Sequence, residues 1–194
     1  MLRFFMCCLV TCSLVLTLSL PLPALLNPKI RSFETLAIEQ RRLLSAYCRL
    51  DFQGARLSPE GWERMRNLSN FRENPDFTSV FIVSRYQLIE VTAPTEEIQV
   101  AYVVVGRYEE GAGYMPMPST VRNVTFEIRD QSGELRIVRI DPPTPFVSRK
   151  AAIDWLKSRL TNQKEESGRA QIEASIKALE AESASPPASK PVSK

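Results

Sequence analysis

The sequence predicts an α+β domain in which a cone-like, curved antiparallel sheet packs against N-terminal helices and a C-terminal helix. Three observations lead to this class. Apolar residues recur at helical spacing before residue 70, they alternate with a period of two over 78–140, and helical spacing returns after a proline-rich turn. No helix-length segment separates the alternating stretches, so neighbouring strands are expected to pair antiparallel.

Two helices are expected before the strands. The first covers 34–50, where one side collects the apolar residues Leu36, Leu43, Leu44, Tyr47 and Leu50. The second begins at Ser58, a good N-cap residue, followed by Pro59, which suits the first helical position. Trp62 then repeats at a spacing of three with Met65 and Leu68, which favours a core anchor over a stacking surface.

Four strands are expected over 78–91, 98–108, 121–130 and 135–140. The second of them is apolar on both faces, which is typical of a central strand covered on both sides. The sequence DQSG at 130–133 predicts a hairpin turn between the last two strands. Residues 109–119 contain Gly111, Gly113, Pro116 and Pro118, and we expect them to form a long apolar loop.

The folded domain is expected over 30–160, ending in a helix that Ser148 caps and that runs to about Leu160. The prolines at 142, 143 and 145 end the last strand before it, because proline cannot donate to a strand ladder. Residues 161–194 are polar: we expect a solvated helix over 162–183 and then a disordered tail.

Residues 1–26 have the order of a secretory signal peptide. Arg3 precedes an uncharged apolar run over 4–20, and a Pro-Leu-Pro-Ala stretch ends at Ala24. Cleavage would release a periplasmic or extracellular protein, whereas an uncleaved segment over 4–26 is long enough to anchor the chain in a membrane. This segment is the only membrane contact that we expect. Cys48 is the one cysteine beyond it and is expected to be a small buried residue.

The composition excludes several kinds of chemistry. The chain has no histidine, which rules out a Ser-His-Asp triad, a Cys-His dyad and imidazole metal ligands. Its seven glycines form neither a phosphate-binding loop nor a dinucleotide fingerprint. The net charge of +3 is spread evenly, so no nucleic-acid partner is expected. We expect no metal and no cofactor, and we assign no catalytic residue.

Two segments, LDFQGARLSPEGW at 50–62 and IDPPTP at 140–145, together with the element order, resemble the nuclear-transport-factor-2-like (NTF2-like) superfamily over 34–160. The resemblance is to its exported bacterial members of unknown role. It implies a cone whose open end can hold a small molecule. Some members of the superfamily are isomerases or dehydratases, and relatives dimerise through the exposed sheet face, which leaves a homodimer open here.

Four residues are candidates for binding a ligand in the cone. Asp51 and Arg56 flank the loop after the first helix, where they would either form an ion pair or line the mouth of the cone. Tyr86 and Tyr102 lie on strands and would face inward, although strand tyrosines are more often parts of the core. Three further residues, Arg85, Arg107 and Arg122, would form an anion-binding rim or stand as separate solvated arginines.

Tyr114, Met115 and Met117 are candidates for contact with a partner, with folding back over the core as the alternative. The function expected from these observations is an exported, non-catalytic binding or interaction module for a small hydrophobic ligand or a protein. A small lyase or isomerase acting inside the cone is the first alternative. A membrane-tethered accessory protein is the second.

Overall fold

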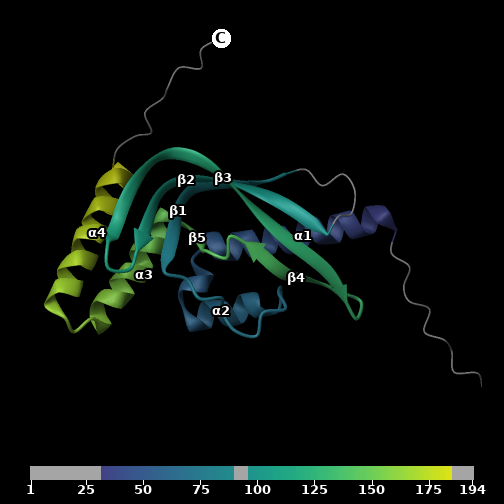
Figure 1. The fold of residues 1–194 in the computed structure, drawn as a ribbon, viewed down its shortest axis with the longest axis horizontal. Helices are drawn as coiled ribbons and strands as arrows, with labels where there is room; N and C mark the ends of the chain where they lie inside the picture. The colour runs from purple at the N-terminus through teal and green to yellow at the C-terminus, as the bar shows by residue number, and fades with distance from the viewer. Residues whose placement is uncertain (1–31, 90–95, 185–194) are drawn as a thin grey trace, which may run out of the picture. The chain divides into compact units, whose positions relative to one another are not determined.

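Five strands form one mixed sheet that curls strongly into a half-barrel (Figure 1). The structure, a computed structural model, describes residues 32–89 and 96–184. The strands are β1 (Ser79–Leu88), β2 (Glu97–Glu109), β3 (Gly113–Gln131), β4 (Glu134–Asp141) and β5 (Phe146–Ser148), in the spatial order β4-β3-β2-β1-β5. The predicted α+β class is confirmed. The predicted signal segment and the tail beyond 184 lie outside the described residues.

The helices are α1 (Phe33–Phe52), the 3₁₀-helix η1 (Ala55–Leu57), α2 (Pro59–Arg66), α3 (Arg149–Asn162) and α4 (Glu166–Ala184). Three of them begin at a serine whose side chain accepts a hydrogen bond from the backbone N–H three residues later: Ser32, Ser58 and Ser148. The two caps predicted from the sequence are therefore confirmed. Within the described residues, no helix is both long enough and apolar enough to cross a bilayer.

The antiparallel order β1-β2-β3-β4 agrees with the predicted meander, and the hairpin at 130–133 closes β3 onto β4. The turn places both Ser132 and Gly133 at positive φ, and the Asp130 carboxylate accepts from the Gly133 N–H at 2.8 Å. One strand was not predicted: β5 runs parallel to β1 at its edge, pairing with Phe81–Val83. Three residues are too few to show a period, so no sequence pattern marks this strand.

The inner face of the half-barrel carries the larger hydrophobic core, and α1 and α2 lie inside the curl of the sheet (Figure 1). Leu44 and Tyr47 of α1 and Met65 of α2 are fully buried against alternate residues of β2 and β3. Trp62 is 6% exposed in the same cluster, so the prediction that it is a core anchor is confirmed.

The outer face carries a second core, formed where α3 and α4 cover Val80, Ile82 and Tyr108. The expectation of a solvated helix after 161 differs from the structure, because α4 buries one of its sides. The buried apolar residues of α4 follow one another at spacings of four and three: Ile172, Ile176 and Leu179. Earlier in β2, Ala101 and Val103 are only half-buried on this outer face. This central strand is therefore covered on both faces only near its C-terminal end.

The expected loop over 109–119 is wrong. The β2–β3 turn occupies only residues 110–112, and β3 begins at Gly113. Gly106 of β2 makes this possible, because the Tyr114 ring lies so close that a Cβ at this position would collide with it. The stretch of β3 that contains Pro116 and Pro118 pairs with β2 alone, since β4 begins to pair only at Thr125.

Candidate functional site

A continuous row of aromatic rings fills the inner face, and it includes both tyrosines predicted to face inward. Ring centroids are 5.6 Å apart between Phe52 and Tyr86, 5.8 Å between Tyr86 and Tyr102, 4.5 Å between Tyr102 and Phe146, and 5.2 Å between Phe146 and Phe81. Tyr102 is fully buried, whereas Tyr86 is half-buried near one end of the row. The chain's own side chains therefore occupy the space that an open cone would offer to a ligand.

Asp51, in the last turn of α1, joins this helix to β5. Its carboxylate is 2% exposed and accepts a hydrogen bond from the Phe146 N–H at 3.1 Å. Burial raises the pKa of Asp51 to about 6, although the positive charge of Arg56 and the Phe146 N–H both act to lower it. The desolvation of the carboxylate is thus only partly compensated by its surroundings.

Arg56 does not form the expected hydrogen-bonded ion pair with Asp51. Its guanidinium, 1% exposed, donates to backbone oxygens of Pro143 at 2.6 Å and Pro75 at 3.4 Å, and to Asn74 Oδ1 at 3.3 Å. Arg56 therefore holds two loops that lie far apart in the sequence, and it acts on Asp51 only through its charge. Neither residue lines an open mouth.

Three more polar side chains surround Asp51 in the interior. The Tyr102 hydroxyl donates to Cys48 Sγ at 3.2 Å, and burial raises the pKa of Cys48 to about 12. Burial also raises the pKa values of Tyr47 and Tyr102, so the thiol and both phenols are neutral at physiological pH. None of the three is activated as a nucleophile.

Two arginines of the predicted rim converge on one aromatic ring. The guanidinium carbon of Arg122 on β3 lies 4.5 Å from the centroid of Phe81, and that of Arg107 on β2 lies 5.9 Å from it. Arg85 does not join them. It is opposite Val103 in the β1–β2 ladder, it precedes the inward-facing Tyr86 in the chain, and it is exposed. The sequence left open whether the three arginines form a rim or stand apart, and the structure brings two of them to the same ring.

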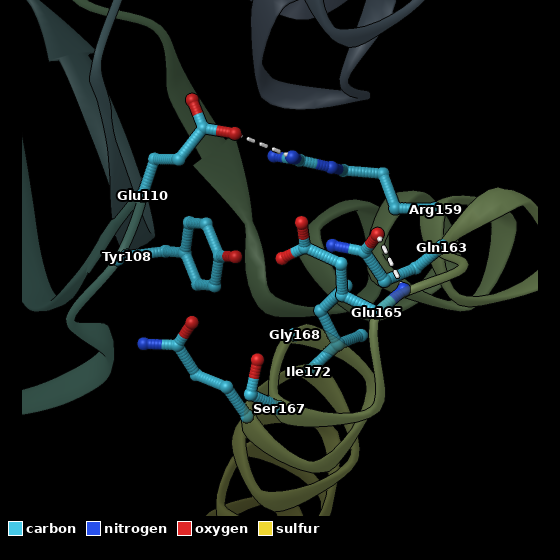
Figure 2. A pocket seen from close by; sticks show the side chains of 10 residues that line it. Tyr108, Glu110, Arg159, Gln163, Glu165, Ser167, Gly168 and Ile172 are labelled. Carbon is cyan, nitrogen blue, oxygen red and sulfur yellow. Dashed lines mark hydrogen bonds and ion pairs between the residues drawn. The ribbon is translucent and has the colours of Figure 1, made fainter.

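A polar crevice of about 540 Å³ lies between the β2–β3 turn and the corner between α3 and α4 (Figure 2). Tyr108 and Glu165 point into it, and the Arg159 side chain donates to Glu110 Oε1 at 2.6 Å across its rim. A second crevice, of about 440 Å³, shares Arg159 and two other lining residues with the first. Sequence reasoning missed both, because they depend on how α4 packs and no motif marks them.

A third crevice, of about 380 Å³, lies between α1 and the β3–β4 hairpin, with Leu36, Ile128 and Leu135 in its lining. Asp51, Tyr47 and Tyr102 line none of the three crevices. These three crevices are therefore separate from the buried carboxylate and its neighbouring phenols.

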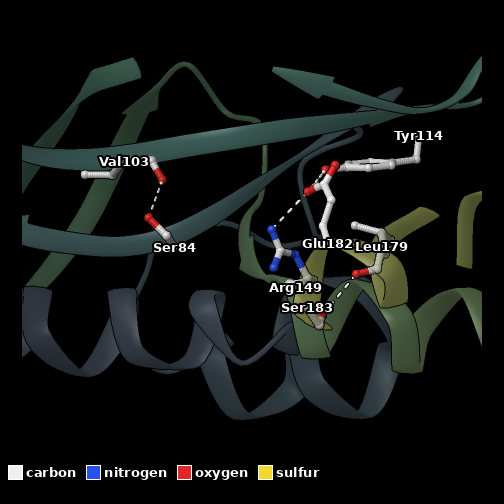
Figure 3. Close-up of polar contacts among 7 residues, drawn as sticks. All are labelled: Ser84, Val103, Tyr114, Arg149, Leu179, Glu182 and Ser183. Atoms are coloured by element: carbon white, nitrogen blue, oxygen red, sulfur yellow. Dashed lines mark hydrogen bonds and ion pairs between the residues drawn. The ribbon is translucent and has the colours of Figure 1, made fainter. Parts of the chain in front are cut away.

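Of the three residues predicted to contact a partner, Tyr114 is turned into the fold (Figure 3). Its hydroxyl donates to Glu182 Oε2 at 2.9 Å, and Arg149 donates to the same oxygen at 3.0 Å. This contact ties the start of β3 to α4 and α3. Met117 packs against the inner core, and Met115 is 36% exposed. These three residues do not form one continuous exposed surface.

Polar side chains thus line the outer crevice beside Arg159, and the buried thiol and phenols described above line none of the three crevices. Comparison of the chain with protein-family models, with curated proteins and with solved structures finds no match.

Proposed function

We propose that this chain is an exported, non-catalytic binding module with an NTF2-like fold. One observation carries the proposal: the inner face of the half-barrel is filled by the ring row from Phe52 to Phe81, with Tyr102 fully buried at its centre. The curled sheet packed with helices is the arrangement that the NTF2-like resemblance implies. The apolar run at 4–20 supports export.

A filled interior changes the kind of ligand that we propose. A small hydrophobic molecule would need an apolar cavity, and no crevice described above includes the ring row in its lining. The crevice beside Arg159 instead offers carboxylate, amide, phenol and guanidinium groups. It therefore suits a small polar ligand.

The same geometry disfavours a lyase or isomerase acting inside the half-barrel. Such an enzyme would use Asp51 as its acid or base, because burial brings the pKa of this carboxyl toward neutrality. A substrate would have to reach hydrogen-bonding distance of the carboxylate. Asp51 already accepts a hydrogen bond from the Phe146 N–H and is only 2% exposed. These contacts favour a structural role for this buried carboxylate over a catalytic one.

Benzene uptake tests whether the interior is filled. The wild-type protein should show no benzene-dependent rise in melting temperature. Tyr102→Ala should show one, because it removes a ring at the centre of the row and leaves an apolar cavity. Tyr86→Ala is the matched control: it removes the same side chain from a half-buried position and should take up no benzene. Saturable stabilisation of the wild type would contradict the proposal, since it would show an open cone.

Fractionation of the producing cells, followed by N-terminal sequencing, tests export. A start shortly after Ala24 is expected for the processed, released protein. An intact N-terminus in the membrane fraction would favour the tethered accessory protein instead. An intact N-terminus in the cytosol would contradict export in either form.

A further inference from the structure

The strongest unexplained charge arrangement lies over Phe81 on the inner face. Phe81 is 6% exposed, and two guanidinium groups approach its ring from neighbouring strands, Arg107 from β2 and Arg122 from β3. Cation–π attraction favours one guanidinium above a ring. Bringing a second to the same ring adds repulsion between two like charges.

The carboxylates of the described residues compensate only one of these charges. Arg107 forms an ion pair with Glu109 at 3.1 Å, with both side chains more than a third exposed. Arg122 is exposed and has no acidic partner within residues 32–89 and 96–184, where its guanidinium lies over the Phe81 ring. The Arg107 Nε atom is buried and has no hydrogen-bond partner in that part of the chain. Near the Phe81 ring, the Arg107 Nε–H donor and the positive charge of Arg122 are therefore not matched by acceptors or carboxylates of the described residues.

We propose that Arg107 and Arg122 bind a phosphate group above Phe81. A phosphate monoester carries up to two negative charges and three acceptor oxygens, and a phosphodiester headgroup carries one charge and two such oxygens. Two guanidinium forks can bind either group through charge-assisted hydrogen bonds. A carboxylate fits less well, because Glu109 already supplies one to Arg107. The cation–π contact with the Phe81 ring favours the present orientation of the Arg122 guanidinium, which lies 4.5 Å from the ring centroid.

The phosphate has two potential sources, a free phosphorylated molecule or the headgroup of an anionic phospholipid, and two binding assays distinguish them. Isothermal titration of the full-length protein in detergent with inorganic phosphate measures the first. Co-flotation with phosphatidylglycerol-containing vesicles, against pure phosphatidylcholine vesicles, measures the second. We expect binding in at least one assay, and it should weaken as salt rises.

Substitutions identify the arginines responsible. Arg122→Gln and Arg107→Gln should each weaken binding by about tenfold or more, because each removes a charged donor. Arg122→Lys should weaken it less, since the charge stays while the fork is lost. Arg85→Gln is the matched control: it removes the same charge from an exposed position of β1 that pairs with Val103, and it should leave binding unchanged.

Three results would overturn the proposal: no binding of the wild type in either assay, binding by Arg122→Gln equal to that of the wild type, or an equal loss in Arg85→Gln. Thermal unfolding of each variant confirms that it is folded before binding is compared. The phosphate site is separate from the crevice beside Arg159. If the phosphate proposal fails, the proposed binding module is still tested by the benzene and export experiments.

Discussion

Replacing Asp51 by asparagine should stabilise the protein at neutral pH and leave it unchanged in acid. Asparagine keeps an oxygen that can accept from the Phe146 N–H, and it removes the charge that burial disfavours. The pKa of Asp51 is raised from its usual 3.8 to about 6 in the folded protein. The folded state therefore binds a proton more readily than the unfolded chain, and stability falls as pH rises from about 4 to about 6.

The size of the effect follows from these two values. At about 1.4 kcal/mol per pH unit, the difference between them corresponds to about 3 kcal/mol lost by the wild type above pH 6. Urea unfolding followed by circular dichroism, at pH values spaced from about 4 to 8, measures the free energy of unfolding for both proteins. The advantage of Asp51→Asn should be near zero at the acid end and should reach about 2 to 3 kcal/mol at the neutral end.

Asp154→Asn is the control for this experiment. Asp154 is exposed on α3, where it pairs with Lys150 at 2.5 Å, and its loss should change stability by less than about 0.5 kcal/mol. A difference between Asp51→Asn and the wild type that does not vary with pH would refute the reasoning. So would a wild type that gains stability relative to the variant as pH rises.

Three further substitutions test the packing, each measured by urea unfolding. Trp62→Ala should cost about 3–5 kcal/mol, because the indole is 6% exposed in the inner core, and a near-neutral result would place this residue on a surface instead. Gly106→Ala should cost about 1–3 kcal/mol, because the new Cβ would press on the Tyr114 ring; no loss would mean that the ring does not lie there. Tyr114→Phe should cost about 1 kcal/mol through its lost hydrogen bond to Glu182, and an unchanged stability would show that this contact does not hold α4.

Elements with strong local signals could be predicted from the sequence. Ser58 and Ser148 mark helix starts by their capping chemistry, and the two-residue period marks β2. The sequence carries no local signal for elements whose formation depends on a tertiary contact. β5 becomes a strand only because Phe81–Val83 offers it an edge. The segment from Gly113 becomes a strand because Tyr114 finds room over Gly106.

The burial of α4 could have been found. Ile172, Ile176 and Leu179 follow helical spacing, but the polar residues around them outweighed this pattern. The candidate sites could not be found in the same way. Arg107 and Arg122 reach the same ring through the register of β1, β2 and β3, which includes an irregularity between Val104 and Gly106 that spacing along the chain does not reveal.

The two prolines of β3 affect how this protein behaves at high concentration. The start of this edge is covered by α4, because the Tyr114 N–H donates to Ser175 Oγ, but between Met115 and Val124 β3 pairs with another strand on one side only. Such an unpaired edge invites a strand from another molecule. Pro116 and Pro118 have no N–H to offer to an incoming strand, so any intermolecular ladder started there would lack two of its rungs. The same residues that made this segment look like a loop thus protect a long, curved strand from aggregation.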